Sequence, residues 1–449
     1  MKKKIPKEYL PILVFAVIQL VYHILMREPE SSDAMWFFQN QLDAYSLKDY
    51  LMTRYETWAS RLLIEAVLVY ISRNILLWKV LDWIFWVFLA WAFAGLFPKE
   101  HRERAAYLIV GFLLVYPMWD LRTAGWIATS VNYTWPLALG VFSLHGAAKA
   151  FYNEKTSPLM WTLYGLAALF GANMEQMSAV ILAVNFCAVV YFILEQKSVR
   201  LYGCAIIGFV IAAAEFVFIM TCPGNAARKN QEIINWMPDF GTYSLLDKIS
   251  MGFVDTMHHL IASGNLMYLC YAGLLAWIVC RKTKELRFRV AAIFPVGFNI
   301  CLVAFPDMLE KQFGKFSKLF EKNAFICGNN YQTAANYIPT LLYLVIIGCM
   351  LVSLVAVCES YFELFAQAVL LGLGLATRVI MGFTPTIYVS QERTFFYLYM
   401  ILGISGVYLI QNNRTLFAEQ DKAYHTWKLA GVLFAAAGVI LNLTEIGSC

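Results

Sequence analysis

Charged residues are scarce in this chain. Asp, Glu, Lys and Arg make up 14% of its 449 residues, while 60% of the residues are hydrophobic; soluble proteins average roughly 25% charged residues. One water-soluble core cannot hide so much apolar surface, so lipid must cover part of it. This composition excludes an ordinary soluble globular protein. The net charge of +5 is small, and we expect no nucleic-acid partner.

A cysteine-based metal or disulfide pattern is also missing. The ten cysteines are scattered, and no CxxC pair or Cys/His cluster occurs among them. Neither a zinc site nor a disulfide framework is therefore supported. We expect no cofactor.

Long apolar runs dominate what is present. A spanning helix needs about 20 apolar residues, and the runs predict an all-α, polytopic bundle of about thirteen spans in a single transmembrane domain. The first run follows Lys2-Lys3-Lys4 but has no small-residue cleavage site, so we interpret it as a retained helix. The predicted spans lie near 9–26, 75–97, 105–119, 137–152, 159–172, 177–194, 201–220, 264–280, 290–305, 338–358, 361–377, 394–410 and 429–444.

The basic residues predict the orientation. Lys and Arg are enriched in cytoplasmic loops, and placing the N-terminus in the cytoplasm puts KEHRER (99–104) and RKTKELRFR (281–289) there, with roughly half of the 35 basic residues on that side. Counting 58–73 as a span would put RKTKELRFR outside. We therefore predict that 46–73 forms amphipathic helices on the outer membrane surface. Their polar faces would carry Arg54, Glu56, Arg61 and Glu65.

This topology places the unusual polar segments on the outer face. They are 27–45, 119–136, 173–176, 222–230 and 377–394. The longer outer loops cover 27–74 and 221–263, and the C-terminal spans cover 338–449. Convergence of these segments would create one composite site at the lipid–water boundary.

Each polar segment also has a structural interpretation. Asp33 is equally explained as a solvated loop acid, Arg228 and Lys229 as interfacial anchors, and NMEQ (173–176) as a tight turn. Together, an outer carboxylate and several outer arginines suit transfer of a group from a phosphate-bearing donor. Arginine binds phosphate in a bidentate fork, and a carboxylate can act as a general base toward a hydroxyl.

An early Asp in a long outer first loop, followed by surface helices and a multi-span bundle, resembles the GT-C superfamily of glycosyltransferases. The ordered set NYTWP, NMEQ, PGNAAR and FTPTIY…ERT resembles, more narrowly, an uncharacterised bacterial family related to enzymes that decorate surface polysaccharides. The resemblance covers nearly the whole chain, and its motifs are weak singly.

The resemblance implies an inverting transferase with its active site outside the cytoplasmic membrane. Its donor would be a polyprenyl-phosphate sugar, its acceptor a surface glycan or lipid-linked glycan, and its surroundings membrane lipids. Asp33 corresponds to the expected catalytic carboxylate. Many relatives carry two adjacent acids where this chain has Ser32-Asp33, so we expect no metal.

The remaining candidate residues fall into two groups by expected role. We expect the lipid phosphate to be neutralised by Arg228, Lys229, Arg61 and Arg393. We expect sugar contacts from Glu175, Asn132, Asn225, Tyr133, Trp135 and Trp126.

Other classes remain open. A lipid or glycan transporter would show inverted repeats and ionisable residues at the bilayer midplane, and no convincing repeat is found. A surface-polysaccharide polymerase would also use arginines in outer loops. A non-catalytic scaffold would not need clustered acids and arginines.

Overall fold

The computed structural model of the chain describes residues 6–313, 320–417 and 422–448, so the predicted Lys2-Lys3-Lys4 start lies outside it. Helices and turns, without a strand, make up these described residues. The all-helical class predicted from the sequence is confirmed.

Apolar helices in the described residues are long enough to cross a membrane. Eight qualify by length and composition, or nine if the bent pair Leu245–Ile261 and Leu266–Lys282 forms one span. Three shorter apolar helices, Tyr9–Leu25, Leu62–Ile71 and Pro158–Ala172, accompany them. The chain is therefore a multi-pass helical membrane protein, whereas the total of thirteen spans stays a prediction.

The chain forms two compact units. The first consists of Met1–Gln231, Gln391–Tyr397 and Gly431–Cys449, and the second of Glu232–Ser390 and Leu398–Ala430. The first unit contains α1 (Tyr9–Leu25), α2 (Asp33–Phe37), α3 (Gln41–Ala44), α4 (Leu47–Thr57), α5 (Leu62–Ile71), α6 (Ile75–Gly95), α7 (Lys99–Val115), η1 (Met118–Arg122), α8 (Trp126–Thr129), η2 (Ser130–Thr134), α9 (Trp135–Ser143), α10 (His145–Phe151), α11 (Pro158–Ala172), α12 (Glu175–Leu194), α13 (Val199–Thr221), η6 (Glu392–Phe395) and most of α14 (Pro223–Trp236).

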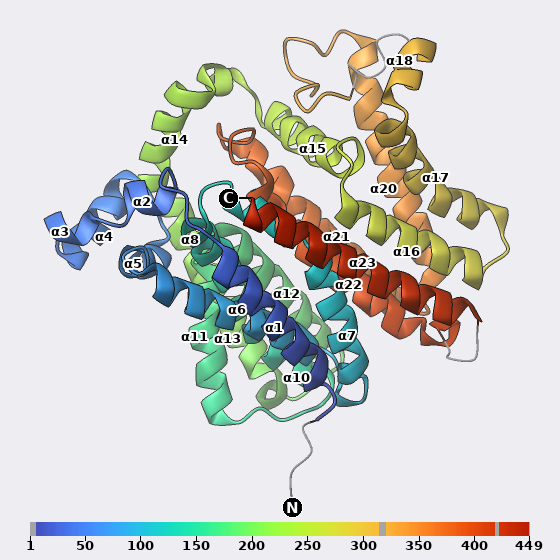
Figure 1. Cartoon of the computed structure of the whole chain (residues 1–449), viewed down its shortest axis with the longest axis horizontal. Coiled ribbons are helices and arrows are strands. Elements are labelled where there is room, and N and C mark those ends of the chain that lie inside the picture. Colours follow the sequence, from blue (N-terminus) through green and yellow to red (C-terminus); the bar gives the residue numbers. More distant parts are fainter. Residues whose placement is uncertain (1–5, 314–319, 418–421, 449) are drawn as a thin grey trace, which may run out of the picture. The chain divides into compact units, whose positions relative to one another are not determined.

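Helices of the first unit pack in a connected series (Figure 1). Helix α1 contacts α6 and α7, α6 contacts α9, and α11 contacts α9 and α13, which in turn packs on α12. Small residues allow the closest of these approaches. A Cβ atom on Gly171 would lie 2.9 Å from the Cα atom of Gly140, so α9 and α11 meet almost backbone to backbone.

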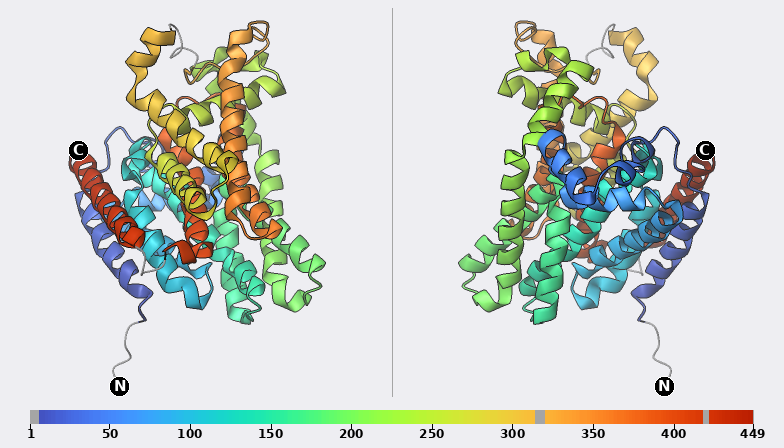
Figure 2. Two further views of the ribbon diagram at one scale, coloured as in Figure 1. Left: turned by 90° about the vertical axis from the view of Figure 1, so that its right-hand side faces the viewer. Right: turned by 90° about the vertical axis from the view of Figure 1, so that its left-hand side faces the viewer.

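The end of the chain also packs on the first helix. In both views of Figure 2 the red end of α23 (Lys422–Gly447) lies beside the blue α1. The Tyr22 hydroxyl donates to the Val439 carbonyl oxygen at 3.5 Å, and Asn442 Oδ1 accepts from the Met118 amide at 2.8 Å. These bonds attach the C-terminal residues to α1 and to the segment that follows α7.

Several predicted spans agree with single helices. Predicted spans 75–97, 177–194 and 201–220 correspond to α6, α12 and α13, with ends that differ by one or two residues. Predicted span 137–152 is instead divided between α9 and α10, and α9 follows directly on η2, which is a π-helical turn. The sequence does not reveal such a turn, because a change in the main-chain hydrogen-bond pattern has no signature in the residue types of a segment predicted to be a polar loop.

Segment 46–73 forms the helices α4 and α5, and their place on a membrane surface stays a prediction, but the polar faces assigned to them are wrong in part. Arg54 Nη2 donates to Glu65 Oε1 at 2.8 Å, and the Glu65 residue is only 4% exposed. Arg61 is also engaged, by Glu175, while Glu56 is exposed. Three of the four side chains therefore tie α4 and α5 to the protein, because burying a charge requires a partner.

The second unit consists of helices, two of which, α15 and α16, meet at a sharp bend. It contains η3 (Pro238–Thr242), α15 (Leu245–Ile261), α16 (Leu266–Lys282), α17 (Leu286–Ala304), α18 (Pro306–Phe313), η4 (Ala334–Asn336), α20 (Tyr337–Val357), α21 (Tyr361–Val379), η5 (Ile380–Phe383), most of α22 (Phe396–Asn412) and the start of α23. Helices α15 and α16 meet at 75°. A buried ion pair between Arg378 and Asp255 connects α21 to α15.

Candidate functional site

Two loops of the first unit are joined at Asp33. The Asp33 amide donates to the Ala124 carbonyl oxygen at 3.0 Å, and Glu28 Oε2 accepts from the Ile127 amide at 3.1 Å. Ser32 caps α2, since its hydroxyl oxygen accepts from the Met35 amide at 3.4 Å. These bonds fix the start of α2, and with it Asp33, against the loop between α7 and α8.

A glycine makes this contact between loops possible. Gly125 has φ of +89°, and a Cβ atom there would lie 2.3 Å from Ser32 Cβ and 2.4 Å from Glu28 Oε1. The left-handed region and the lack of space both favour glycine. Gly125 thus lets the loop approach the Asp33 segment.

Asp33 lies within electrostatic range of a basic side chain from a distant part of the sequence. Burial raises the pKa of the Asp33 carboxyl, and the nearby Arg393 guanidinium opposes that rise. Arg393 Nη1 also donates to Thr123 Oγ1 at 3.5 Å. A partly desolvated carboxylate beside a guanidinium suits proton acceptance close to an anionic group.

Asp120 and Glu392 are further acids at this place that the sequence interpretation left without a role. They lie on η1 and η6, which pack against each other. Burial raises the pKa of Asp120 to about 7, and the negative charge of Glu392 raises it further. Asp120 lies inside one of the predicted outer segments, but no sequence signal shows its proximity to Glu392.

A second cluster forms around Arg61. Arg61 Nε donates to Glu175 Oε2 at 2.7 Å, and Arg61 Nη1 donates to Asn132 Oδ1 at 3.0 Å. Glu175 occupies the first turn of α12, where the helix dipole favours a negative charge. Asn132 lies in the π-helical turn η2, and such turns are frequent at functional sites.

The segment that opens α14 lies against the link between α4 and α5. Asn225 Nδ2 donates to Ser60 Oγ at 3.1 Å. A Cβ atom on Gly224 would lie 2.6 Å from the Tyr55 carbonyl oxygen. Arg228 stands close enough to Glu175 for electrostatic attraction, whereas Lys229 is exposed.

Hydrogen bonds between helices join two groups of residues. One is the Asp33 cluster (Asp33, Asp120, Glu392 and Arg393), and the other is the Arg61 cluster (Arg61, Glu175 and Asn132). Gln176 Nε2 donates to the Thr394 carbonyl oxygen at 3.4 Å, next to Arg393. The Tyr397 hydroxyl donates to the Tyr133 carbonyl oxygen at 3.3 Å, next to Asn132. One polar region of the first unit therefore contains residues from all five predicted polar segments. These are 27–45, 119–136, 173–176, 222–230 and, from the fifth, 391–394. The rest of the fifth segment, up to residue 390, belongs to the second unit.

The three aromatic candidates are placed in the interior. Trp126, Tyr133 and Trp135 are 2%, 8% and 3% exposed. The Trp135 ring stacks on Phe85 with a centroid distance of 4.3 Å. In this arrangement these rings pack the protein, and a sugar would need a rearrangement to reach their faces.

No metal-binding arrangement is found in the described part of the chain. Residues 6–313, 320–417 and 422–448 contain no group of three or more His, Cys, Asp or Glu placed to hold an ion. Metal independence stays a prediction.

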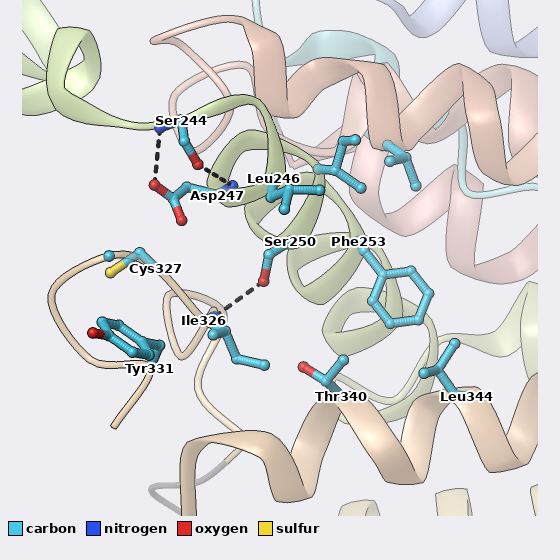
Figure 3. A pocket seen from close by; sticks show the side chains of 13 residues that line it. Ser244, Leu246, Asp247, Ser250, Phe253, Ile326, Cys327, Tyr331, Thr340 and Leu344 are labelled. Carbon is cyan, nitrogen blue, oxygen red and sulfur yellow. Dashed lines mark hydrogen bonds between the residues drawn. The ribbon is translucent and has the colours of Figure 1, made fainter. Parts of the chain in front are cut away.

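A separate open groove of about 560 Å³ lies within the second unit. Ser250, Phe253, Ile326, Thr340 and Leu344 are among the residues that line it (Figure 3). Its walls come from the start of α15, the loop that precedes α20, α20 itself and Val379 at the end of α21. It contains none of the candidate site residues.

The fold and the site define a multi-pass helical membrane protein whose first unit gathers carboxylates and arginines from distant segments. No family model, curated protein or solved structure matches the chain.

Proposed function

We propose that this protein is an inverting glycosyltransferase that takes a sugar from a polyprenyl-phosphate donor and passes it to a glycan or lipid-linked acceptor on the extracytoplasmic side. The convergence of Asp33 and Arg393 with the Arg61–Glu175–Asn132 cluster supports the proposal most strongly. The distribution of Lys and Arg over the loops supports the sidedness.

The proposed reaction is a single displacement. An acceptor hydroxyl oxygen attacks the anomeric carbon and forms the new glycosidic bond while the bond from that carbon to the phosphate oxygen breaks. Asp33 takes the hydroxyl proton, and the bonding electron pair leaves with the lipid phosphate. One displacement inverts the anomeric centre, and a positioned general base contributes about 10² to 10⁴ in rate.

Arginines neutralise the leaving group in this proposal. Arg393 lies within electrostatic range of Asp33, and Arg228 lies within electrostatic range of Glu175. Because guanidinium groups stay charged and bind phosphate in bidentate fashion, they stabilise the negative charge that develops in the transition state. Lys229 adds an exposed cation at the same segment.

Glu175, Asn132 and Asn225 orient the sugar in this proposal. Glu175 and Asn132 already bind the two ends of the Arg61 guanidinium, which fixes their directions. Preorganised polar groups of this kind bind a substrate without a large ordering cost.

Release of prenyl phosphate tests the proposal directly. Purified protein in lipid nanodiscs is incubated with a panel of synthetic prenyl-phosphate sugars and membrane-derived acceptor glycans. We expect release of prenyl phosphate together with a new glycosidic bond in the wild type and neither product in Asp33→Asn. Movement of the lipid-linked sugar across proteoliposomes without a covalent change would instead favour a transporter, and repeated lengthening of a lipid-linked glycan would favour a polymerase.

A further inference from the structure

A buried acid and a histidine meet between two apolar helices of the first unit. Asp82 of α6 and His23 of α1 are each 2% exposed, and His23 Nε2 lies 2.9 Å from Asp82 Oδ2. The other ring nitrogen, His23 Nδ1, lies 2.7 Å from the Gln19 carbonyl oxygen. Asp82 Oδ1 accepts from Trp135 Nε1 at 2.8 Å.

These contacts define how many protons the pair holds. A carbonyl oxygen only accepts, so Nδ1 of His23 must carry a hydrogen. The short contact from Nε2 to the Asp82 carboxyl oxygen then needs a hydrogen as well, because a bare nitrogen and a carboxylate oxygen would repel each other. One proton therefore lies between His23 and Asp82, on either atom.

The pair is connected to the turn that carries Asn132. Trp135 follows directly on the π-helical turn η2, and its N–H is held by Asp82. Ser130, the first residue of η2, accepts from Trp78 Nε1 at 2.8 Å. Both ends of the turn are thus tied to α6, while Asn132 in its middle binds Arg61.

Close packing of α1 on α6 does not by itself require ionisable side chains at positions 23 and 82. A charge within the bilayer is costly, and apolar side chains of similar volume often stabilise a core as well or better. The Gln19 side chain, one turn before His23, is also completely buried and has no hydrogen-bond partner among the described residues. The ionisable neighbours Lys79 and Tyr22 donate elsewhere, to the carbonyl oxygens of Ile24 and Val439.

We infer that His23 and Asp82 form a proton-holding pair that positions the π-helical turn, and through it Asn132, for binding of the sugar donor. Both are positioning residues that act through Trp135 and Asn132. The connection to donor binding rests on the proposed function, while the proton arrangement and the effect on the turn do not.

Two substitutions of Asp82 separate the effect of its hydrogen bonds from the effect of its side-chain volume. In Asp82→Asn the amide oxygen accepts from Trp135 and the amide NH₂ donates to neutral His23, so every bond is kept. In Asp82→Leu both bonds are lost. Asn185→Leu is the matched control, because Asn185 is a buried polar residue of α12 whose amide bonds only to Ile181 of its own helix among the described contacts.

Amide hydrogen exchange of residues 130–135 and the kinetics of transfer measure the effect. We expect exchange at least about tenfold faster in Asp82→Leu, with a donor KM raised about tenfold and kcat changed by less than threefold. We expect wild-type values in Asp82→Asn and Asn185→Leu. Unchanged exchange in Asp82→Leu, a fall in kcat alone, or an Asp82→Asn variant that behaves like Asp82→Leu would overturn the inference.

Nitrogen-15 spectra of the six histidines test the proton arrangement without any substrate. The His23 signal is assigned by its loss in His23→Gln. We expect a protonated Nδ1 in the wild type and in Asp82→Asn, and an Nε2 signal that shifts in Asp82→Asn because the proton shared with Asp82 is lost; an unprotonated Nδ1 or an unchanged Nε2 signal would overturn the pair. If the wild type transferred no sugar, the proposed function would fail, while hydrogen exchange and the spectra would still decide the role of the pair.

Discussion

Arg61 and Glu175 are 114 residues apart in the sequence, and their side chains meet at 2.7 Å between Nε and Oε2. The same guanidinium reaches Asn132 of the π-helical turn at 3.0 Å. One arginine therefore connects the segment before α5, the turn before α9 and the start of α12. Each candidate residue in this cluster has both a structural and a proposed catalytic role, and the experiments below separate the two.

The Arg61–Glu175 pair should couple in a double-mutant cycle. Both side chains are partly buried, at 20% and 27% exposed, so screening by water is limited. We expect Arg61→Gln and Glu175→Gln to show a coupling energy of about 1 to 3 kcal/mol in unfolding experiments, with a raised donor KM in each. The exposed pair Arg73–Asp43, at 43% and 57%, is the control and should couple by less than about 1 kcal/mol. Equal coupling in the two pairs would contradict the role given to Arg61.

Asp33→Asn should remove transfer and leave the protein folded. The fold uses the main-chain amide of Asp33, which donates to Ala124 and is unchanged by the substitution. We expect a loss of about 10² to 10⁴ in kcat, measured as prenyl phosphate release, with an unfolding temperature within about 2 °C of the wild type. Glu30→Gln, an exposed acid three residues away, should keep wild-type activity. Full activity of Asp33→Asn would remove Asp33 from the mechanism.

Gly125→Ala should disturb the Asp33 segment. A positive φ costs a residue with a Cβ atom about 1 to 2 kcal/mol, and the added atom would collide with Ser32 and Glu28. We expect lower thermal stability and at least about tenfold lower kcat. Gly111→Ala in α7 is the control, because nothing lies within 4 Å of its added Cβ atom. Wild-type activity in Gly125→Ala would show that the loop contact does not position Asp33.

Asp120 should make stability depend on pH. Its pKa is raised from the ordinary value of 3.8 to about 7 by burial and by Glu392. The folded protein therefore binds this proton more tightly than the unfolded chain, and the wild type loses stability as the pH rises from about 4 through about 7. We expect Asp120→Asn, which stays neutral, to unfold at a higher temperature than the wild type at pH 8 and at the same temperature near pH 4. A difference that does not change with pH would contradict a raised pKa.

The sequence determined the class of structure because apolar composition and run length are local properties. Helices α6, α12 and α13 follow from long, mostly apolar runs, and the breaks between runs indicate where polar segments gather. The sequence does not predict the π-helical turn at 130–134, because this segment has the residue types of a polar loop before the span that begins near residue 137.

The sequence predicts which residue types make up the candidate site, but it does not predict which of them pair with each other. A sequence shows that Glu175 needs a partner but does not identify Arg61, because the pairing depends on how distant helices pack. For the same reason Glu65 was assigned to a solvated face, although it is buried against Arg54. Tryptophan is a residue type that can stack on sugars, which is why Trp135 is predicted to do so. Its contacts with Phe85 and Asp82 depend on the packing of distant helices and are not visible in the sequence.

The arrangement of donor and protein tests the account most directly. A cryo-EM structure of the protein in nanodiscs with a non-hydrolysable prenyl-phosphonate sugar would place the phosphorus atom and the anomeric carbon. We predict a phosphonate within hydrogen-bond distance of Arg228 or Arg393, with the anomeric carbon on the side of Asp33 that an acceptor hydroxyl can reach. A phosphonate bound away from both arginines, or an Asp33 carboxyl that faces the cytoplasmic side, would contradict the proposal of sugar transfer.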